Sequence, residues 1–334
     1  MKALRPQLRR VDALSVEQCR KLGETRRMIR LWTSTFGVLV ALGPLAAPVA
    51  AGGNVRIAVV QSRDAPPFRA VRTGFERVLR QKGIAASYQI YPLDAEGNPP
   101  RSLLRSEAGL LLTLGPVAGR AASSQIHDVP IVGALIRRSD RVEATGNATG
   151  VLIDYPVDTQ LRWMQRLLPK HRKVGVLFNP GENAERIDSA NRAAKDLGMK
   201  LLAEEVYRPG DLPKGLREIA RGADLIWGLA DQMALTHQTA KKFIVFSFRN
   251  RIPLSGGTTS WVKSGALFSL ERDYEDIGMQ CGELAVKILA GASPASLPPT
   301  APRRLLYSVN LKTARYMRVK LSDRVIQDAA YVFE

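Results

Sequence analysis

Short apolar runs alternate with amphipathic segments along most of the chain. In its first part, four runs have the length and composition of buried strands: 55–61, 86–91, 109–114 and 129–135. Apolar residues at helical spacing occupy three segments between them: 68–82, 100–107 and 117–125. Gly83 follows the first of these helices, at a position that favours a left-handed residue. Strands that alternate with helices in this way predict a parallel, doubly wound sheet.

A polar, glycine-containing passage at residues 137–150 interrupts this rhythm, which then begins again. Helices are predicted at 157–168, 183–197, 212–221 and 233–250, and strands at 174–178, 200–206, 225–229 and 252–255. A strand at 266–270, a helix at 274–290, a proline-rich loop and a strand at 303–310 complete these units. The predicted fold class is α/β, with two doubly wound Rossmann-like lobes and a cleft between them.

The division into lobes gives domain limits. We expect an N-terminal lobe at residues 54–143, completed by about 270–305. The C-terminal lobe is expected at residues 150–265, completed by about 306–334. A length of 334 residues suits two domains, because one hydrophobic core rarely grows to serve a chain of that size.

Residues 1–51 have the features of a signal peptide with a leader. Basic residues precede an uncharged segment, 31–49, whose end is rich in small residues. Its strongly apolar part is shorter than the roughly 20 residues that span a bilayer, which favours a cleaved signal over an anchor. Translation starts at Met1 or at Met28. Cleavage would leave Cys281 as the single cysteine and exclude an intrachain disulfide. No cysteine follows the apolar segment, where a lipid-modified one would lie, so the sequence predicts a protein of the periplasm and not a lipoprotein.

The formal net charge of +18 raises the question of an acidic partner. The basic residues are scattered along the chain, which favours a solvated basic surface over a nucleic-acid site. Common enzyme motifs are missing: G-x-G-x-x-G after a strand, G-x-S-x-G, H-E-x-x-H and C-x-x-C. We therefore expect a monomer that is not an enzyme, with no catalytic residue, metal, cofactor or nucleic-acid partner.

Polar loops recur at the carboxyl ends of the predicted strands. Open α/β sheets bind ligands at these ends, where helix N-termini present free N–H groups. The candidate ligand-binding residues are Gln61, Ser62, Arg63, Gly115, Pro116, Asn179, Asp231, Ser255 and Gly256. Asn179 is the side chain that we expect to face a solute, whereas Asn183 is expected to cap its helix. Asp231 fits a capping role equally well, so the prediction depends on the loops jointly.

Several stretches together resemble a known family. They include "KVGVLFNPGENAERID", "ADLIWGLADQMAL", "DYEDIGMQCGELAVKILAGASPASLP" and "YSVNLKTARYM", in this order between residues 55 and 334. They are similar to ABC-transporter substrate-binding proteins of the tryptophan/tyrosine-uptake type. The resemblance implies a periplasmic-binding-protein type I fold, in which two lobes close on a small ligand. It also implies that the protein delivers this ligand to a membrane permease. By position it implies the same ligand loops, and it adds Asp273 near the hinge.

The chain departs from the family pattern in two loops, and the ligand class stays open. Relatives that bind amino acids usually show a short apolar turn where this chain has "IRRSD" at 136–140. Arg63, in the loop after the first strand, is also unusual, and either Arg63 or Arg137 could hold an anion in a bidentate manner. The predicted ligand is therefore a small polar solute, amino-acid-like or an organic anion.

Three other functions compete with transport. The same two-lobed body could serve as a ligand-binding sensory module for a membrane receptor kinase, which the sequence does not distinguish from a transport receptor. A lac-repressor-like regulator needs an N-terminal helix-turn-helix, and the apolar segment at 31–49 argues for export instead. A nucleotide-using enzyme on a Rossmann-like sheet is disfavoured by the missing glycine fingerprint.

Overall fold

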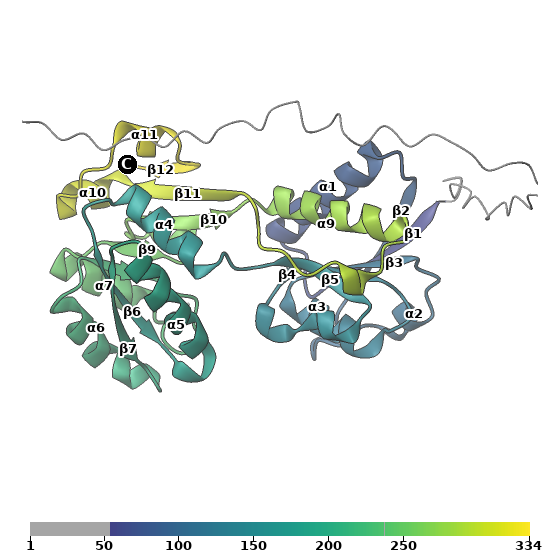
Figure 1. Ribbon diagram of the computed structural model, residues 1–334, viewed down its shortest axis with the longest axis horizontal. Coiled ribbons are helices and arrows are strands. Elements are labelled where there is room, and N and C mark those ends of the chain that lie inside the picture. The colour runs from purple at the N-terminus through teal and green to yellow at the C-terminus, as the bar shows by residue number, and fades with distance from the viewer. Residues whose placement is uncertain (1–53, 237) are drawn as a thin grey trace, which may run out of the picture. The chain divides into compact units, whose positions relative to one another are not determined.

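The computed structural model describes residues 54–236 and 238–334, which contain two β-sheets (Figure 1). The first sheet is parallel and has five strands in the order β2-β1-β3-β4-β5. Its strands are β1 (Val55–Gln61), β2 (Ala86–Pro92), β3 (Leu110–Leu114), β4 (Ile131–Ile136) and β5 (Ala148–Leu152). Helices connect the first four strands: α1 (Pro66–Gln81), α2 (Arg101–Leu104) and α3 (Pro116–Gln125). Two short 3-10 turns, Arg138–Asp140 and Val142–Thr145, lead into β5.

The second sheet has seven strands in the order β12-β11-β10-β9-β8-β6-β7. Its strands are β6 (Lys173–Phe178), β7 (Lys200–Glu205), β8 (Leu225–Trp227), β9 (Leu254–Gly256), β10 (Phe268–Arg272), β11 (Leu305–Asn310) and β12 (Tyr331–Phe333). Only β10 and β11 pair in an antiparallel manner within this sheet. Its helices are α4 (Val157–Leu167), α5 (Pro180–Asp196), α6 (Leu212–Ala220), α7 (Ala240–Asn250), α8 (Thr259–Lys263), α10 (Leu311–Met317) and α11 (Asp323–Gln327). Further 3-10 turns lie at Pro209–Asp211 and Pro294–Ser296.

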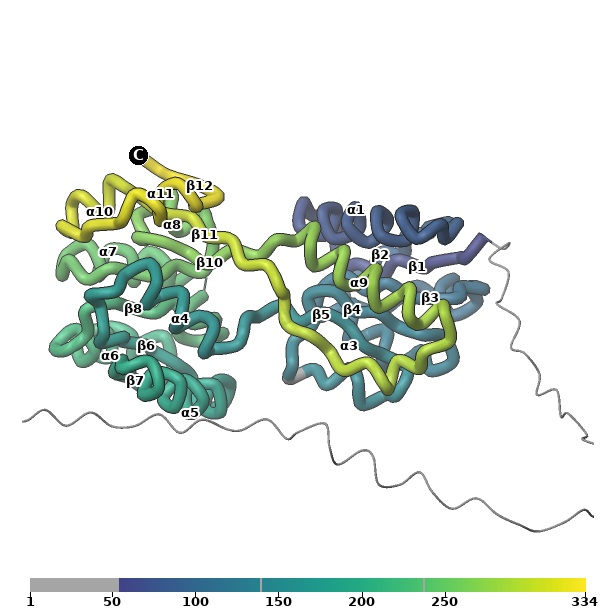
Figure 2. Tube along the Cα trace, turned by 45° about the horizontal axis from the view of Figure 1, so that its top comes forward, coloured from purple at the N-terminus to yellow at the C-terminus, as the bar shows by residue number. Residues whose placement is uncertain are grey.

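Helix α9 (Tyr274–Leu289) belongs to the first sheet although it follows a strand of the second. It runs along α1, as both views of the chain show (Figures 1 and 2). The helices approach closely, because a Cβ atom added to Gly278 would lie 1.9 Å from the carbonyl oxygen of Val71. The chain therefore passes between the sheets three times: after β5, between β10 and α9, and between α9 and β11.

Both faces of the first sheet are covered, as a doubly wound sheet requires. Successive side chains of a strand point to opposite faces. Ile57 and Val59 of β1 pack with α1 and α9, whereas Ala58 and Val60 pack with α2 and α3. The second sheet repeats the arrangement, with α4, α5, α10 and α11 on one face and α6, α7 and α8 on the other. The predicted α/β class with two doubly wound units is confirmed.

The strand β5 is the main element that the sequence analysis missed, and its residues place the first sheet past the expected boundary at residue 143. The strand reads Ala-Thr-Gly-Val-Leu, which looks like part of a polar, glycine-containing connection. Gly150 pairs with Gly133 of β4, and a Cβ on Gly150 would lie 1.9 Å from the Gly133 carbonyl oxygen. In the sequence Gly150 suggests a turn, but in the structure it allows β5 to lie close to β4.

Helix α7 was predicted to begin at residue 233 and begins at Ala240 instead. The residues before Ala240 form turns, which hydrogen bonds with the side chains of Asp231 and Thr239 stabilise. Asp231 accepts hydrogen bonds from the backbone N–H groups of residues 233 and 234, and the Thr239 hydroxyl donates to the carbonyl oxygen of Ala234 at 2.8 Å. These local bonds compete with a helix, which is the usual effect of Asp and Thr near a helix start. Four short elements, α8, α10, α11 and β12, were not predicted.

The predicted signal peptide at residues 1–51 lies outside the described residues. Within residues 54–236 and 238–334, none of the helices has both the length and the apolar character needed to span a membrane.

Candidate functional site

The candidate residues of the first sheet lie next to one another at the ends of β1 and β3. Gln61 of β1 pairs with Leu114 of β3, which brings the loop that begins at Ser62 beside Gly115. Gln61 is buried, whereas Ser62 and Arg63 are exposed. Gly115 has a φ of 93°, and a Cβ there would lie 2.8 Å from the ring of Phe68. These loops form one polar edge of the first sheet, and their part in binding stays a prediction.

The two arginines proposed as anion ligands form no ion pair with the residues that the structure describes. Both Arg63 and Arg137 are exposed. Asp64, beside Arg63, pairs with Arg69 at 2.9 Å. After β4, Asp140 pairs with Arg120 at 3.0 Å and accepts a hydrogen bond from the Arg137 backbone N–H. The side chains that could neutralise these arginines thus have other partners.

Asp231 organises the loop after β8 and ties it to the loop after β6. It is buried, and its Oδ1 atom accepts from the N–H groups of Met233 and Ala234 at 2.7 and 2.6 Å. Its Oδ2 atom accepts from the Asn179 N–H at 2.7 Å and from the Asn183 side chain at 2.8 Å. A carboxylate has about four acceptor positions, so Asp231 is saturated by the protein itself.

The prediction that Asn183 caps its helix is wrong. Helix α5 has Asn179 at the N-cap position and Pro180 at its first position, so Asn183 lies inside the first turn. Asn183 is 1% exposed, and its amide donates to Asp231 and to the Ala230 carbonyl oxygen. The Asn179 amide donates to the Val206 carbonyl oxygen at 3.1 Å, toward the end of β7. Proline's fixed φ favours the first helical position, which starts the helix three residues early.

Ser255 and Gly256 contribute backbone to the same region. The Ser255 carbonyl oxygen accepts from the Gly228 N–H at 2.9 Å, which joins the ends of β9 and β8. A Cβ on Gly228 would lie 2.2 Å from this oxygen, and one on Gly256 would lie 2.8 Å from the Cβ of Trp261. Side chains are therefore excluded at two adjacent strand ends, where Gly228 is half-buried and Gly256 is buried.

These strand ends form part of a cavity at the edge of the second sheet. It is lined by Asp154, Tyr155, Gln160, Arg186, Trp227, Gly228, Ala230, Ser255, Gly256, Gly257, Leu270 and Arg272. Ser255 and Gly256 are the two predicted candidates among them. The sequence analysis missed the charged lining, because Asp154 follows the unrecognised strand β5 and Arg186 lies within a helix rather than in a loop.

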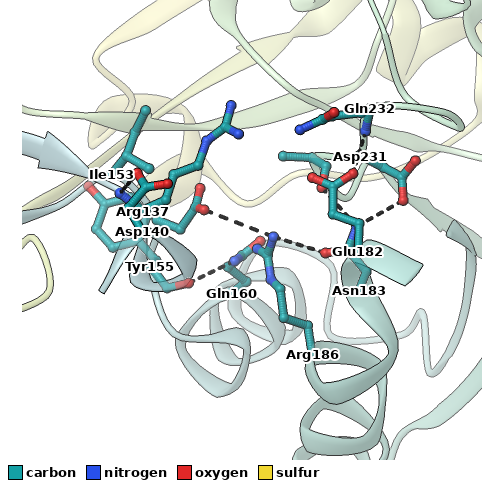
Figure 3. A network of polar contacts seen from close by, with 12 residues as sticks. Arg137, Asp140, Ile153, Tyr155, Gln160, Glu182, Asn183, Arg186, Asp231 and Gln232 are labelled. Atoms are coloured by element: carbon teal, nitrogen blue, oxygen red, sulfur yellow. Dashed lines mark hydrogen bonds and ion pairs between the residues drawn. The ribbon is translucent and has the colours of Figure 1, made fainter. Parts of the chain in front are cut away.

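Three charged side chains meet in this cavity. The Asp154 carboxylate lies 3.2 Å from the Arg272 guanidinium and 3.9 Å from that of Arg186. Arg272 also donates through Nε to the Ile153 carbonyl oxygen. Arg186 extends from α5 and donates to the Asn183 side-chain oxygen at 3.2 Å (Figure 3). All three side chains are partly buried, so their interactions are screened less than those of surface ions.

A chain of neutral hydrogen bonds supports the other wall. The indole N–H of Trp227, which is 1% exposed, donates to the Gln160 side-chain oxygen at 3.2 Å. The Gln160 amide donates to the Tyr155 carbonyl oxygen at 2.9 Å (Figure 3). Buried polar groups that are all paired hold their positions firmly. The cavity thus combines fixed charges, an aromatic ring and the glycine-rich ends of two strands.

Tyr155 connects the three passages of the chain between the sheets. It is buried. Its hydroxyl can donate a hydrogen bond to the Arg304 carbonyl oxygen, at 2.7 Å, or to the Glu271 carbonyl oxygen, at 3.0 Å. Tyr155 belongs to the first passage, Glu271 precedes the second and Arg304 ends the third. Burial raises the pKa of this phenol, which therefore stays protonated and remains a donor.

Replacing Tyr155 by phenylalanine is expected to lower the free energy of unfolding by about 1 to 2 kcal/mol, because two partly buried carbonyl groups share the lost donor. Urea denaturation measures the difference. Tyr316→Phe is the control, since Tyr316 is 49% exposed and its hydroxyl forms no hydrogen bond with residues 54–236 and 238–334. Equal stability of the two variants would contradict a linking role for Tyr155.

Asp273 lies apart from the cavity lining. It caps α9 by accepting from the Asp276 N–H at 3.0 Å, and it pairs with Arg304 at 3.1 Å. Asp276 in turn pairs with Arg303 at 2.9 Å. Asp273 therefore fixes the start of α9 to the third passage, close to the position that the family resemblance implies for a hinge residue.

Metal-ligating side chains do not cluster in the described part of the chain. No group of three or more His, Cys, Asp or Glu residues there could hold a metal ion. Burial raises the pKa of the Cys281 thiol, and it lowers the pKa of His171. A buried thiol with a raised pKa is a poor nucleophile.

Two doubly wound α/β units, joined by three passages of chain, define the periplasmic-binding-protein type I fold. A family model described as ABC transporter substrate binding protein matches residues 56–333, and the chain belongs to this family. Its members bind a solute for a transporter and are not enzymes, in agreement with the sequence prediction.

Individual relatives are distant. The chain is 24% identical over 263 residues to a tyrosine-binding protein of Clostridioides difficile, covering 73% of this chain and 75% of the relative. Among solved structures, a ligand-free, open substrate-binding protein with adhesive properties from Clostridium difficile is 20% identical with a TM-score of 0.68, and 84% of this chain and 99% of that one are covered. An ABC domain from Streptococcus pneumonia in complex with L-Trp is 19% identical with a TM-score of 0.58, covering 84% and 100%.

Proposed function

We propose that this protein is the periplasmic substrate-binding component of an ABC transporter and binds a small polar solute, either amino-acid-like or an organic anion. The names of its relatives support the first class, since one is a tyrosine-binding protein and another was solved with L-Trp. The observation that carries the proposal is the cavity at the edge of the second sheet, where Asp154 and two arginines lie beside Trp227 and the glycine-rich strand ends. Small-ligand sites typically combine an apolar wall with a few fixed polar groups.

Binding is proposed to work by hinge closure. A ligand shifts an equilibrium between open and closed forms only if it binds the closed form more tightly. The cavity would supply the contacts of the C-terminal lobe, and the loops at Gln61 to Arg63 and at Gly115 and Pro116 those of the N-terminal lobe. The three passages of chain would act as the hinge, with Tyr155 and Asp273 at its ends.

The remaining parts of the proposal concern the cell. The predicted signal peptide at residues 1–51 would direct the chain to the periplasm. There a monomer would bind its solute and deliver it to a membrane permease of the same transporter.

Thermal unfolding of the purified protein with a panel of amino acids and organic acids tests this function. A ligand present at a hundred times its Kd stabilises the folded state by about 2.7 kcal/mol, which raises Tm by several degrees. Small-angle scattering with the same compound should report a smaller radius of gyration if the lobes close. Unchanged Tm with every compound of the panel would contradict the proposed function.

A further inference from the structure

We propose that Asp154 and Arg186 together bind the charged head group of an α-amino acid, the ammonium group at Asp154 and the carboxylate at Arg186. This inference rests on the proposed function and narrows its ligand class from two alternatives to one. The inference is carried by the position of these two side chains, which line the same cavity. The Asp154 carboxylate and the Arg186 guanidinium lie 3.9 Å apart.

Arg186 has donors left for a ligand. A guanidinium carries five N–H groups. Among the described residues, the recorded hydrogen bond of Arg186 is the one from its NH1 atom to the Asn183 side-chain oxygen. Asn183 is itself fixed by its bond to the saturated Asp231. The Asn183 contact therefore fixes one nitrogen of Arg186. The other N–H groups of the planar guanidinium stay available and suit a carboxylate.

Arg272 is the less suitable arginine. Its Nε atom donates to the Ile153 carbonyl oxygen and its NH2 atom to Asp154 at 3.2 Å. Its side chain is 20% exposed, against 29% for Arg186. Arg272 thus orients Asp154 and offsets part of its charge, which leaves the second arginine for the solute.

Asp154 has one oxygen left for an ammonium group. Its Oδ1 atom accepts from Arg272, whereas its Oδ2 atom faces Arg186 at 3.9 Å, beyond the length of a hydrogen bond. The carboxylate and ammonium groups of an α-amino acid are joined by one carbon atom. Such a molecule can place opposite charges against this acid and base at the same time.

The other acids of this region are engaged elsewhere. Asp231 is saturated by four donors, and Glu182 accepts from the Gln232 N–H at 2.7 Å (Figure 3). Glu271 accepts from the hydroxyls of Ser269 and Ser308. The cavity lining therefore holds one carboxylate and two guanidinium groups, an excess of positive charge that disfavours a purely cationic ligand.

Calorimetric titration with four compounds tests the assignment: L-tyrosine, L-tryptophan, tyramine, which lacks the carboxylate, and 3-(4-hydroxyphenyl)propionate, which lacks the ammonium group. The wild-type protein should bind L-tyrosine or L-tryptophan, and it should bind the two truncated compounds more weakly by about 10-fold or more, the value of a charge-assisted hydrogen bond. Failure to bind either amino acid, with binding of other acids from the panel, would reject this inference and leave the proposed function standing.

Two variants separate the roles of the residues. Arg186→Gln should weaken L-tyrosine binding by about 10- to 100-fold and leave tyramine binding unchanged, so that the preference for the carboxylate disappears. Asp154→Asn should weaken L-tyrosine binding but not binding of 3-(4-hydroxyphenyl)propionate. Arg192→Gln is the matched control, because Arg192 is exposed on the same helix, and it should bind like the wild type.

A structural role of Arg186 predicts a different pattern. If Arg186 only stabilised the fold, its loss would lower Tm and weaken all four compounds by the same factor. Equal losses for tyramine and L-tyrosine would therefore overturn the carboxylate assignment. Arg186→Lys serves as the second variant, since it keeps the charge without the bidentate fork and should recover only part of the affinity.

Discussion

Replacing Gly278 by alanine is expected to lower the free energy of unfolding by about 3 kcal/mol, at the upper end of the usual cost of overpacking. The added Cβ would lie 1.9 Å from the Val71 carbonyl oxygen and 2.7 Å from its carbon, so a backbone and not a flexible side chain must move. Gly74 faces the same crossing, with its own Cβ position 2.0 Å from the Glu275 carbonyl oxygen. Helices α1 and α9 would have to separate.

Urea denaturation of Gly278→Ala, followed by circular dichroism, measures this cost. Gly210→Ala is the control: a Cβ at Gly210 would meet no atom within 4 Å, and its φ is not in the left-handed region. The control should unfold at nearly the wild-type urea concentration. A Gly278→Ala protein as stable as the control would mean that α1 and α9 are packed less closely than described.

Replacing Asp231 by alanine is expected to cost about 3 kcal/mol as well, for an electrostatic reason. Three backbone N–H groups and the Asn183 amide lose a charged acceptor together, and buried donors without a partner are expensive. The loops after β6 and β8 would no longer be joined. Because Asn183 orients Arg186, the loss of Asp231 should also displace Arg186 in the binding cavity.

Thermal unfolding without ligand distinguishes this role from direct ligand contact. Asp231→Ala should lower Tm clearly in the absence of any solute, whereas the control Asp188→Ala, at an exposed position of α5, should not. A variant that keeps the wild-type Tm but loses binding would instead assign Asp231 to the ligand, as the sequence analysis did.

The fold was largely predictable from the sequence because most strands of both sheets pair in parallel and are buried, which gives continuous apolar runs. Strand β1 occupies the predicted residues 55–61, and Gly83 after α1 has the predicted left-handed φ, 70°. Strand β5 was missed because Thr149 and Gly150 interrupt its apolar residues, although the whole strand is buried and Gly150 lies against Gly133 of β4. Close backbone contact of this kind leaves no apolar pattern in the sequence.

The candidate site was predictable only in outline. Strand ends identified Ser255 and Gly256, because the rule for open α/β sheets depends on topology alone. It did not identify Asp154 or Arg186, whose positions near the cavity depend on how a connecting segment and a helix are placed. Asn179 and Asp231 were chosen as polar residues at strand ends; they bond to the Val206 carbonyl oxygen and to backbone N–H groups, and their contact with a ligand stays a prediction.

The position of α9 gives the chain a particular order of folding. The sheet face that carries Ile57 and Leu110 is covered partly by residues 274–289, which are made late in synthesis. Until those residues arrive, that face stays open to water, however complete strands β1 to β5 are. The last element of the N-terminal lobe is thus synthesised only after most of the C-terminal lobe.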